Sequence, residues 1–559
     1  MKMTGAQMAV EALALEGVRC VFGIPGGAVL PLYDALREAP FSHILVRHEQ
    51  AAAHAADGYA RASGEPGVCI CTSGPGFTNI LTGLATAHFD SVPMVAITGQ
   101  VATALLGTDA FQEADTFGDS LSHVKHCFLV RSPDDIPSVI RSAFEIAASG
   151  RPGPVVVELP VDIQRSGGEY IRPEKVLFAR HRARNEENGS RMAKAARLLE
   201  TAERPVILAG GGVIAGGAAQ QLLRLAERLQ SPVATTLMGK GAFPESHALS
   251  LGMAGMHGTP AANLALSDAD VILGVGTRFS DRTTGKAAEF AKNAAVIHID
   301  IDDAEIDKIV RCAVPLVGEA GAILAGLAET LTERETSEWA AATQKMKDDY
   351  PLADPDETDF LPSAIFGTLQ QRLGNHWTAA VDVGQHQMWA ALFWKAHYPR
   401  TFLTTGGLGT MGYALPAAMG ASLAHGKTPV LCFAGDGGFM MNVQELETCA
   451  RYQIPVKIFI LNNDSLGMVR QLQDFYCNGR YFAVNPSSTC HFPTIARGFG
   501  VHARTCSALD ELDDALGDLL HTPGPGLLDC RIPQEELVLP MVPAGAALKD
   551  FVYRVKERV

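Results

Sequence analysis

Basic residues are scarce in this sequence of 559 residues. It holds 46 Lys and Arg against 61 Asp and Glu, a formal net charge of −15. A general nucleic-acid binder relies on Lys and Arg to neutralise phosphates, so this balance argues against such a protein. It leaves room for a small anionic substrate, because such a substrate senses the local site rather than the total charge.

Two further features are missing, a long apolar run and regular cysteine spacing. No uninterrupted apolar span is long enough for a membrane helix, and the chain runs from Met1 into an amphipathic helix pattern without a signal segment. The eleven cysteines are an odd number without framework spacing, and Cys69 and Cys71 alternate in an apolar stretch typical of a buried strand. We therefore expect reduced thiols and a soluble, cytoplasmic protein that does not contact membranes.

The composition, 47% hydrophobic and 19% charged, allows large buried cores. Short apolar strands alternate with helical patterns, which predicts an α/β fold of doubly wound parallel sheets with helices on both faces. Polar stretches at 165–188 and 333–358 are typical of linkers. We predict three domains at 1–164, 190–345 and 360–545, followed by a C-terminal tail at 546–559.

The first and third segments resemble one another. A glycine-rich turn with Phe77 leads through a helix pattern to Pro93, and a similar turn with Phe439 leads to Pro455. The shared placement of Phe and Pro indicates two related modules. Only the second turn carries an acid, Asp436, so the two modules would do different jobs on one ligand.

Asp436 and the pair Asn462-Asn463 each follow an apolar strand. A glycine-flanked Asp alone is often just a tight turn. The combination offers hard oxygen ligands for Mg²⁺, with positions left for phosphate oxygens, and a helix N-terminus there also favours negative charge. We predict a metal site with side-chain ligands Asp436 and Asn463 and a backbone carbonyl near Ser465.

Glu49 stands where an apolar strand meets an alanine-rich helix pattern. A carboxylate in a first helical turn is often only a surface charge that compensates the helix dipole. Here we predict burial, because the apolar strand and the alanine-rich helix meet at this position. A buried Glu has a raised pKa and can share a proton with a ring nitrogen. His54 and Asp57, three apart on the same helix, have no third metal ligand nearby and are predicted to be satisfied or surface side chains.

Together these motifs resemble the thiamine diphosphate enzymes, and among them the catalytic subunits of acetohydroxyacid synthase (acetolactate synthase). Further matching segments are 21–27, 107–113, 384–389, 406–412 and 539–543, and the resemblance runs from about residue 4 to 547. It implies a pyrimidine-binding first domain, a central FAD-binding domain and a diphosphate-binding third domain. FAD is structural in this family, and Gly210-Gly211-Gly212 alone would be a weak signal for it.

The resemblance implies that pyruvate is decarboxylated on thiamine diphosphate. The hydroxyethyl unit then passes to a second 2-oxo acid, chiefly pyruvate, giving 2-acetolactate for branched-chain amino acid biosynthesis. The implied catalytic positions are Glu49, Gly27, Gln112 and Arg282, the last holding the second substrate's carboxylate. Positions implied around thiamine diphosphate are Pro25, Gly26, Gln385, His386, Gly409, Met411, Gly435, Gly437, Gly438 and Met468. Positions implied around FAD are Arg151, Gly210, Gly211, Gly212, Met253, Met256, His257, Gly276, Arg278, Asp300 and Ile301.

Three positions depart from the family pattern. Val161 replaces a Lys at the substrate entrance, Gly438 replaces a Ser beside the diphosphate, and Leu472 replaces a Trp found in many members. That Trp contacts the extra methyl of 2-oxobutyrate. We therefore expect a weaker preference for this substrate, by about 1 kcal/mol.

In this family the site forms between the first module of one chain and the third of another, which implies a homodimer or a dimer of dimers. Many members bind a small regulatory subunit, and the sequence leaves open whether this chain has one. Three other functions stay open: an oxidase or decarboxylase of pyruvate, a glyoxylate carboligase, and a silent cofactor-binding paralogue. The presence of Glu49 argues against the second, and Glu49, Asp436 and Asn463 argue against the third.

Overall fold

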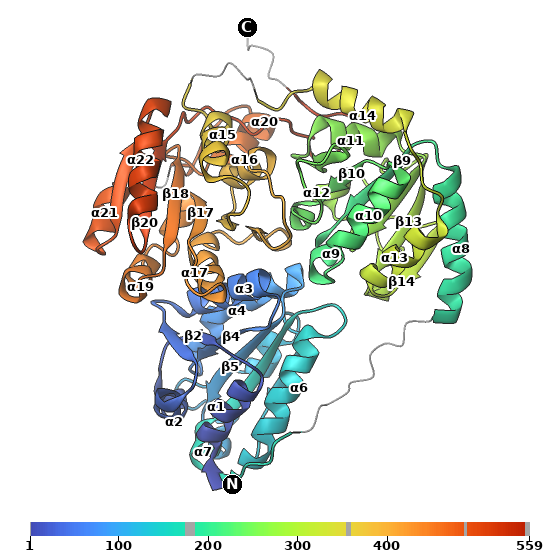
Figure 1. The fold of residues 1–559 in the computed structure, drawn as a ribbon. Coiled ribbons are helices and arrows are strands. Elements are labelled where there is room, and N and C mark those ends of the chain that lie inside the picture. The colour runs from blue at the N-terminus through green and yellow to red at the C-terminus, as the bar shows by residue number, and fades with distance from the viewer. Residues whose placement is uncertain (1, 174–184, 354–358, 486–488, 554–559) are drawn as a thin grey trace.

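The computed structural model describes residues 2–173, 185–353, 359–485 and 489–553. Within these ranges, three six-stranded sheets flanked by helices form three lobes (Figure 1). All the strand pairs in these three sheets are parallel. The predicted α/β fold with three parallel sheets is confirmed.

The first sheet has the strand order β3-β2-β4-β5-β7-β6. Its strands are β2 (Cys20–Gly23), β3 (Ser42–Leu45), β4 (Gly67–Cys71), β5 (Met94–Gln100), β6 (His126–Leu129) and β7 (Pro154–Pro160). Its helices are α1 (Gly5–Leu15), α2 (Leu30–Ala35), α3 (Glu49–Ser63), α4 (Pro75–Asp90), α5 (Thr116–Ser120), α6 (Ile136–Ala148) and α7 (Val161–Arg165). A separate antiparallel pair joins β1 (Lys2–Thr4) to β8 (Gly167–Glu169). Thr4 and Gln7 start α1 with a reciprocal capping box.

The third sheet has the strand order β16-β15-β17-β18-β20-β19. Its strands are β15 (Ala379–Val381), β16 (Phe402–Leu403), β17 (Val430–Gly435), β18 (Val456–Asn462), β19 (His502–Cys506) and β20 (Gly526–Arg531). Its helices are α15 (Pro362–Leu373), α16 (Gln385–Phe393), α17 (Ala414–Ala424), α18 (Asp436–Met440), α19 (Glu445–Tyr452), α20 (Gly467–Cys477), α21 (Phe492–Gly498) and α22 (Leu509–His521). Counted along the chain, the first and third sheets both run 2-1-3-4-6-5, which confirms two related modules.

The central sheet has the strand order β11-β10-β9-β12-β13-β14. Its strands are β9 (Pro205–Ala209), β10 (Val233–Thr235), β11 (Ser250–Met253), β12 (Val271–Val275), β13 (Ala295–Asp300) and β14 (Val314–Val317). Its helices are α8 (Asn185–Thr201), α9 (Gly211–Ala215), α10 (Ala219–Leu229), α11 (Pro260–Asp268), α12 (Asp281–Thr284), α13 (Ala320–Thr330) and α14 (Glu338–Asp349). Counted along the chain it runs 3-2-1-4-5-6, the order of doubly wound sheets that bind dinucleotides.

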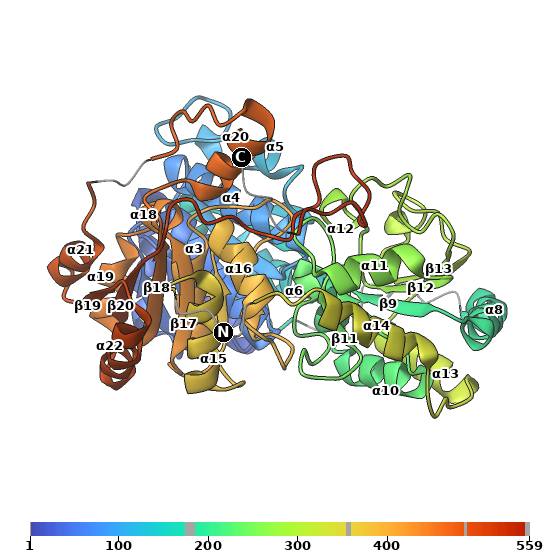
Figure 2. The same cartoon turned by 90° about the horizontal axis from the view of Figure 1, so that it is seen from above.

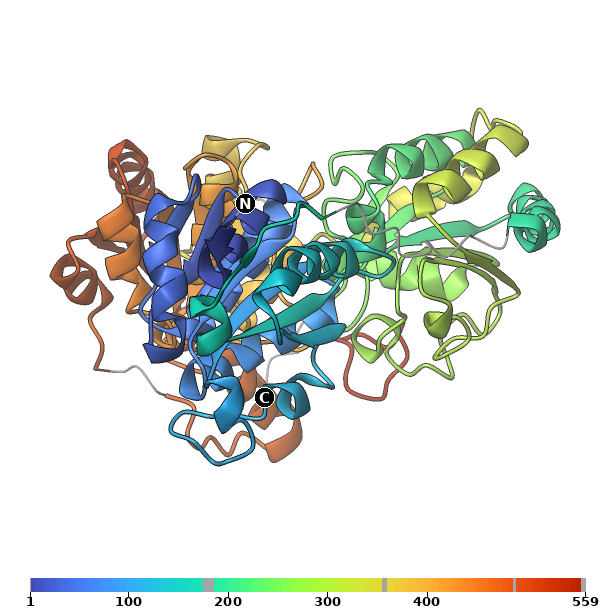
Figure 3. The ribbon, with the colours of Figure 1, turned by 90° about the horizontal axis from the view of Figure 1, so that it is seen from below.

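One hydrophobic core is shared by the first and third domains. On its outer face the first sheet is covered by α1 and α6, which lie in front of it when seen from below (Figure 3). On its inner face α3 and α4 pack with α17. The backbones of α3 and α17 are in direct contact at Gly420, where a Cβ would lie 1.8 Å from the Ala55 carbonyl oxygen. Seen from above, the central domain lies to one side of these two (Figure 2).

The prediction of a linker over 333–358 is wrong in part, because α14 occupies 338–349. Ser337 caps this helix, and the buried Trp339 donates its indole N–H to the Pro205 carbonyl oxygen at 3.1 Å. Within the other predicted linker, 174–184 lie outside the described residues. Within the predicted tail, Leu548 is buried and Val552 forms an antiparallel bridge with Met541. The exact domain boundaries stay predictions.

Among the described residues, no helix is both long enough and apolar enough to cross a membrane. The eleven cysteines are free thiols, as predicted, and both Cys69 and Cys71 are buried in β4.

Candidate active site

A cavity opens at the carboxyl ends of β15 and β17. The winding of the third sheet reverses between these two strands, and such a switch point leaves a crevice between the loops that follow. The cavity holds about 430 Å³ of empty space, part of it open to solvent. Ten predicted site residues line it: Gln385, His386, Met411, Gly435, Asp436, Gly437, Gly438, Asn463, Ser465 and Met468. Gly409 is not among the lining residues of the described chain.

The predicted metal donors converge on this cavity. Asp436 is buried and begins α18, while Asn463 follows β18. The Asn463 side chain donates Nδ2–H to Gln385 Oε1 at 2.9 Å, which leaves Oδ1 as the oxygen that can bind a cation. The side chain of its neighbour Asn462 already has hydrogen-bond partners. Its Nδ2–H donates to Asp529 Oδ1 at 2.8 Å, and its Oδ1 accepts from the Asp464 N–H.

Within the described residues, no group of three or more His, Cys, Asp or Glu could hold a metal ion. A cation in this cavity would therefore depend on one carboxylate together with amide and carbonyl oxygens. The hydroxyl of Ser465 donates to the Val484 carbonyl oxygen at 3.0 Å. This donor set of hard oxygens fits Mg²⁺, with the remaining positions open to phosphate oxygens and water.

His386 also suits a polar ligand. Burial lowers the pKa of this imidazole to about 3, so it is neutral at pH 7. Its Nε2 is buried and has no hydrogen-bond partner among the described residues. Buried polar atoms are normally paired, so an orphan on a cavity wall points to a bound group.

At two glycines on the cavity wall, the side chains of His386 and Gln385 pack directly against the backbone. A Cβ on Gly435 would lie 2.7 Å from His386 Nδ1, and one on Gly467 would lie 1.9 Å from Gln385 Oε1. At Gly438, where the family usually has Ser, a Cβ would lie 2.9 Å from Asp382 Oδ1. The buried Asp382 fills this space, accepting backbone N–H bonds from Val383, Gly412 and Ala414.

A second group of predicted residues gathers at the equivalent edge of the first sheet. Pro25, Gly26 and Gly27 follow β2, and a Cβ on Gly26 would lie 2.5 Å from Thr72, which follows β4. Gln112 reaches the same edge, because a Cβ on Gly74 would lie 2.8 Å from its carbonyl oxygen.

Glu49 begins α3 at this edge, in the first helical turn as predicted. Its Oε2 accepts a hydrogen bond from Asn79 Nδ2 at 2.9 Å. The prediction that Glu49 is buried is wrong for the single chain, in which the residue is half-buried. The reason is that the carboxyl edge of the first sheet is open here.

The two edges do not meet within one chain. Every described residue that lines the cavity belongs to the third domain, so Glu49 and Gln112 lie outside it. Arg282 lies in the central domain on α12, is exposed, and contacts Met256 Sδ through Nη1 at 3.0 Å. Within one chain the two groups of predicted residues thus lie at separate places.

The central domain has its own switch point, between β9 and β12. Gly210 and Gly212 follow β9, Gly276 follows β12, and Gly212 N–H donates to the Gly276 carbonyl oxygen at 3.0 Å. A Cβ on Gly210 would lie 2.2 Å from that oxygen, so only glycine allows the contact. Asp300 ends the neighbouring strand β13, and burial raises the pKa of its carboxyl group to about 6.

Two further predicted FAD positions differ in their surroundings. His257 is buried, burial lowers its pKa to about 4, and its Nδ1 has no partner in the described structure. Arg151 comes from the first domain and contacts the central one, its Nη1 lying 2.7 Å from Glu305 Oε1 and 3.2 Å from Asp302 Oδ2. The unpaired buried nitrogen of His257 and the glycine-rich switch point of the same domain both fit a dinucleotide cofactor.

The prediction that Asp57 is a satisfied or surface side chain is confirmed, because it is fully buried and its Oδ1 lies 2.6 Å from Arg61 Nε. The ion pair itself was not predicted. A usable signal existed, since the two are four apart in an alanine-rich helix.

Three family models match this chain, all of the thiamine pyrophosphate enzymes. The N-terminal TPP binding domain matches residues 3–119, the central domain 192–327 and the C-terminal TPP binding domain 382–530. The fold and the site thus define a thiamine pyrophosphate enzyme.

Full-length relatives narrow this class. The chain is 48% identical to the probable acetolactate synthase large subunit of Methanocaldococcus jannaschii, over 99% of this chain and 96% of that one. It is 43% identical to the acetolactate synthase isozyme 2 large subunit of Escherichia coli, over 99% and 100%. A third relative, the acetolactate synthase large subunit of Parasynechococcus marenigrum, is 45% identical over 98% and 91%. The chain belongs to the acetolactate synthase large-subunit family.

Proposed function

We propose that this chain is a catalytic subunit that condenses two 2-oxo acids, chiefly two molecules of pyruvate, into 2-acetolactate. The observation that carries the proposal is the cavity at the β15–β17 switch point, where Asp436, Asn463 and His386 converge in a chain of this family. Thiamine diphosphate, when bound, supplies the electron sink for decarboxylation. The residues of the chain bind, orient and protect the reacting groups.

Asp436, the Oδ1 of Asn463 and a backbone carbonyl at Ser465 would hold Mg²⁺. The start of α18 adds backbone N–H groups and the positive end of a helix dipole, which favour a diphosphate at this place. Met411 is half-buried on the cavity wall and offers an apolar surface to a ring.

Glu49 would hold and move a proton at a pyrimidine nitrogen through Oε1, because Oε2 is bonded to Asn79. Since Glu49 lies outside the cavity of its own chain, we propose a homodimer, or a dimer of dimers, in which Glu49, Gly27 and Gln112 face the third domain of the other copy. Arg282 would bind the second substrate's carboxylate with its planar guanidinium.

The central domain would bind FAD at the β9–β12 switch point, near Gly210 and Gly276, and the unpaired Nδ1 of His257 would offer a further contact. Relatives of the chain are named large subunits, so we also propose a smaller regulatory partner. The exposed Leu472 on α20, in place of the family's Trp, supports pyruvate rather than 2-oxobutyrate as the main second substrate.

The test is product formation from pyruvate with thiamine diphosphate, Mg²⁺ and FAD, comparing the native chain with Glu49→Ala. We expect 2-acetolactate from the native chain and a large loss in the variant. Acetaldehyde or acetyl phosphate in place of acetolactate would indicate a decarboxylase or an oxidase. If no product forms even with an added small subunit, the chain is a silent paralogue.

A further inference from the structure

The loop 406–412 carries Met411 to the cavity wall, between β16 and α17. Four of its seven residues are glycine. Such a segment has little intrinsic preference for one conformation, so its neighbours must set its shape.

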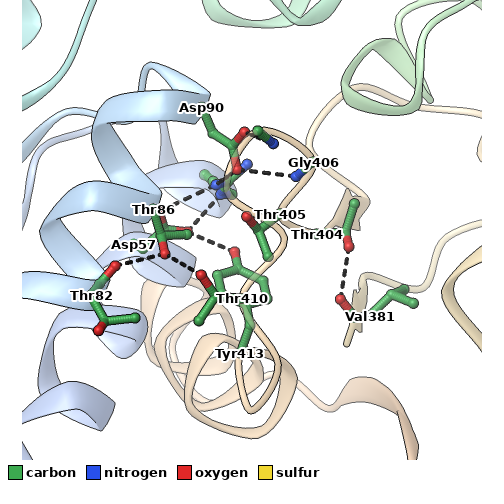
Figure 4. Close-up of polar contacts among 12 residues, drawn as sticks. Asp57, Thr82, Thr86, Asp90, Val381, Thr404, Thr405, Gly406, Thr410 and Tyr413 are labelled. Atoms are coloured by element: carbon green, nitrogen blue, oxygen red, sulfur yellow. Dashed lines mark hydrogen bonds and ion pairs between the residues drawn. The ribbon is translucent and has the colours of Figure 1, made fainter. Parts of the chain in front are cut away.

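The first of these neighbours is Asp90, at the end of α4 in the first domain. Its Oδ1 accepts the Gly407 N–H at 2.8 Å and its Oδ2 accepts the Gly406 N–H at 3.3 Å, as Figure 4 shows for Gly406. A Cβ on Gly407 would lie 2.8 Å from Asp90 Oδ1, so glycine is needed for the loop to sit this closely on the carboxylate.

Asp90 is itself held by a buried ion cluster. Arg61 donates Nη2–H to Asp90 Oδ2 at 2.9 Å and Nε–H to Asp57 Oδ1 at 2.6 Å. Tyr413 donates its hydroxyl to the same Asp57 oxygen at 2.6 Å, a contact that Figure 4 shows. The side chains of Asp57 and Asp90 are 0% exposed and that of Arg61 is 10% exposed. Two carboxylates face one guanidinium, and the N–H groups of the loop help to balance the excess negative charge.

A second contact lies one helical turn earlier on α4. Thr86 donates its hydroxyl proton to the Thr82 carbonyl oxygen at 2.8 Å. A hydroxyl has only one proton, so Thr410 must be the donor in its 2.7 Å contact with Thr86. Residues 86 and 90 share one face of α4, so this helix forms hydrogen bonds with the loop at two points.

The other end of the loop is held by its own domain. Gly412 N–H donates to Asp382 Oδ1 at 2.9 Å, and Asn442 Nδ2–H donates to the Gly412 carbonyl oxygen at 2.7 Å. Between these fixed ends, the position of Met411 depends on the contacts that α4 makes.

We propose that Asp57, Arg61, Thr86 and Asp90 of the first domain are positioning residues that set the shape of the loop 406–412 and so place Met411. The inference deepens the proposed function and rests on it, because it concerns the wall of the proposed cofactor cavity. Each first domain would then serve two sites: its Glu49 the site of the other copy, and its Asp90 the loop of its own chain.

The experiment compares Thr86→Val, which keeps the volume but loses the hydroxyl, with Thr86→Ser, which keeps the hydroxyl. Asp90→Asn tests the carboxylate. The control Glu16→Gln weakens a part-buried ion pair of the same domain, between Glu16 Oε2 and Arg141 Nη1 at 2.6 Å. Each purified full-length variant is measured for kcat, for the KM of pyruvate, and for amide hydrogen exchange of the segment 404–413.

We expect Thr86→Val and Asp90→Asn to lower kcat by about tenfold or more, with the KM of pyruvate within about threefold of native. Exchange at Gly406 and Gly407 should rise in both. Thr86→Ser and Glu16→Gln should stay within about twofold of native in all three measurements. If Asp90→Asn does not fold, the pair of Thr86 variants decides the question.

If amide hydrogen exchange in the loop of Thr86→Val is as slow as in the native chain, the proposal is overturned. Faster exchange in the loop together with a native kcat would also overturn it. A fall in kcat that Glu16→Gln shares would show general destabilisation and would also overturn it. If the native chain makes no acetolactate, the proposed function fails, whereas the exchange measurement still tests the anchoring by itself.

Discussion

Replacing Gly467 by Ala should disrupt the proposed metal site, although neither proposed side-chain donor is itself replaced. Gly467 begins α20, and a Cβ there would lie 1.9 Å from Gln385 Oε1 and 2.7 Å from Asn463 Nδ2. Cβ atoms essentially never come within 3.0 Å of such neighbours, so the Gln385 amide must move by about 1.1 Å. That oxygen is the acceptor that orients Asn463.

The Gln385 amide cannot move freely. Its Nε2 donates to Gln471 Oε1 and to the Glu536 carbonyl oxygen, both at 3.0 Å. Losing the Asn463 bond leaves a buried N–H unpaired, at a cost of about 1–3 kcal/mol. If Asn463 then turns away from the cavity, the cation loses an oxygen ligand. An energy loss of this size corresponds to a roughly 5–150-fold weaker affinity for Mg²⁺ with thiamine diphosphate.

The assay is a titration of Mg²⁺ and thiamine diphosphate followed by tryptophan fluorescence, since Trp389 lines the cavity. The control is Gly517→Ala in α22 of the same domain, where a Cβ would meet no atom within 4 Å. This control should bind like the native chain and unfold at the same or a slightly higher denaturant concentration. Native affinity in Gly467→Ala would refute the link between Gln385, Asn463 and the cation.

Four other predictions concern stability and specificity. Gly420→Ala should lower the free energy of unfolding by about 1–3 kcal/mol, because its Cβ would lie 1.8 Å from the Ala55 carbonyl oxygen; an unchanged urea midpoint would contradict this. Gly438→Ser, which restores the usual family residue, should lower Tm without tightening cofactor binding, because Asp382 occupies the space; tighter binding at native Tm would show otherwise. Burial raises the pKa of Asp382 from 3.8 to about 6, so in this range the folded chain holds a proton that the unfolded chain has lost. The contribution of Asp382 to stability therefore falls by up to about 1.4 kcal/mol per pH unit as pH rises from about 4 to 6. In Asp382→Asn, the urea midpoint should lose this part of its dependence on pH. Leu472→Trp should raise the preference for 2-oxobutyrate about fivefold in a competition assay, and an unchanged product ratio would count against the role of this position.

Much of the fold could be predicted because the signals are local. The apolar stretch around Cys69 and Cys71 predicted a buried strand, which the structure has at Gly67–Cys71. The paired turns at Phe77 and Phe439 predicted two related modules, and the shared strand order confirms them. The residues predicted around the diphosphate follow strands β15, β17 and β18, so once these strands are parallel neighbours, the residues share one edge.

Contacts between distant segments could not be predicted in this way. The sequence by itself determined the modules, their glycine turns and the donor types of the metal site, because these depend on residues close together in the chain. Only the tertiary structure decided that Asn462 is hydrogen-bonded to Asp529, and that Glu49 lies outside the cavity of its own chain. It also placed Asp90 against the loop 406–412 and Asp57 against Arg61, because these buried hydrogen bonds join segments that only packing brings together.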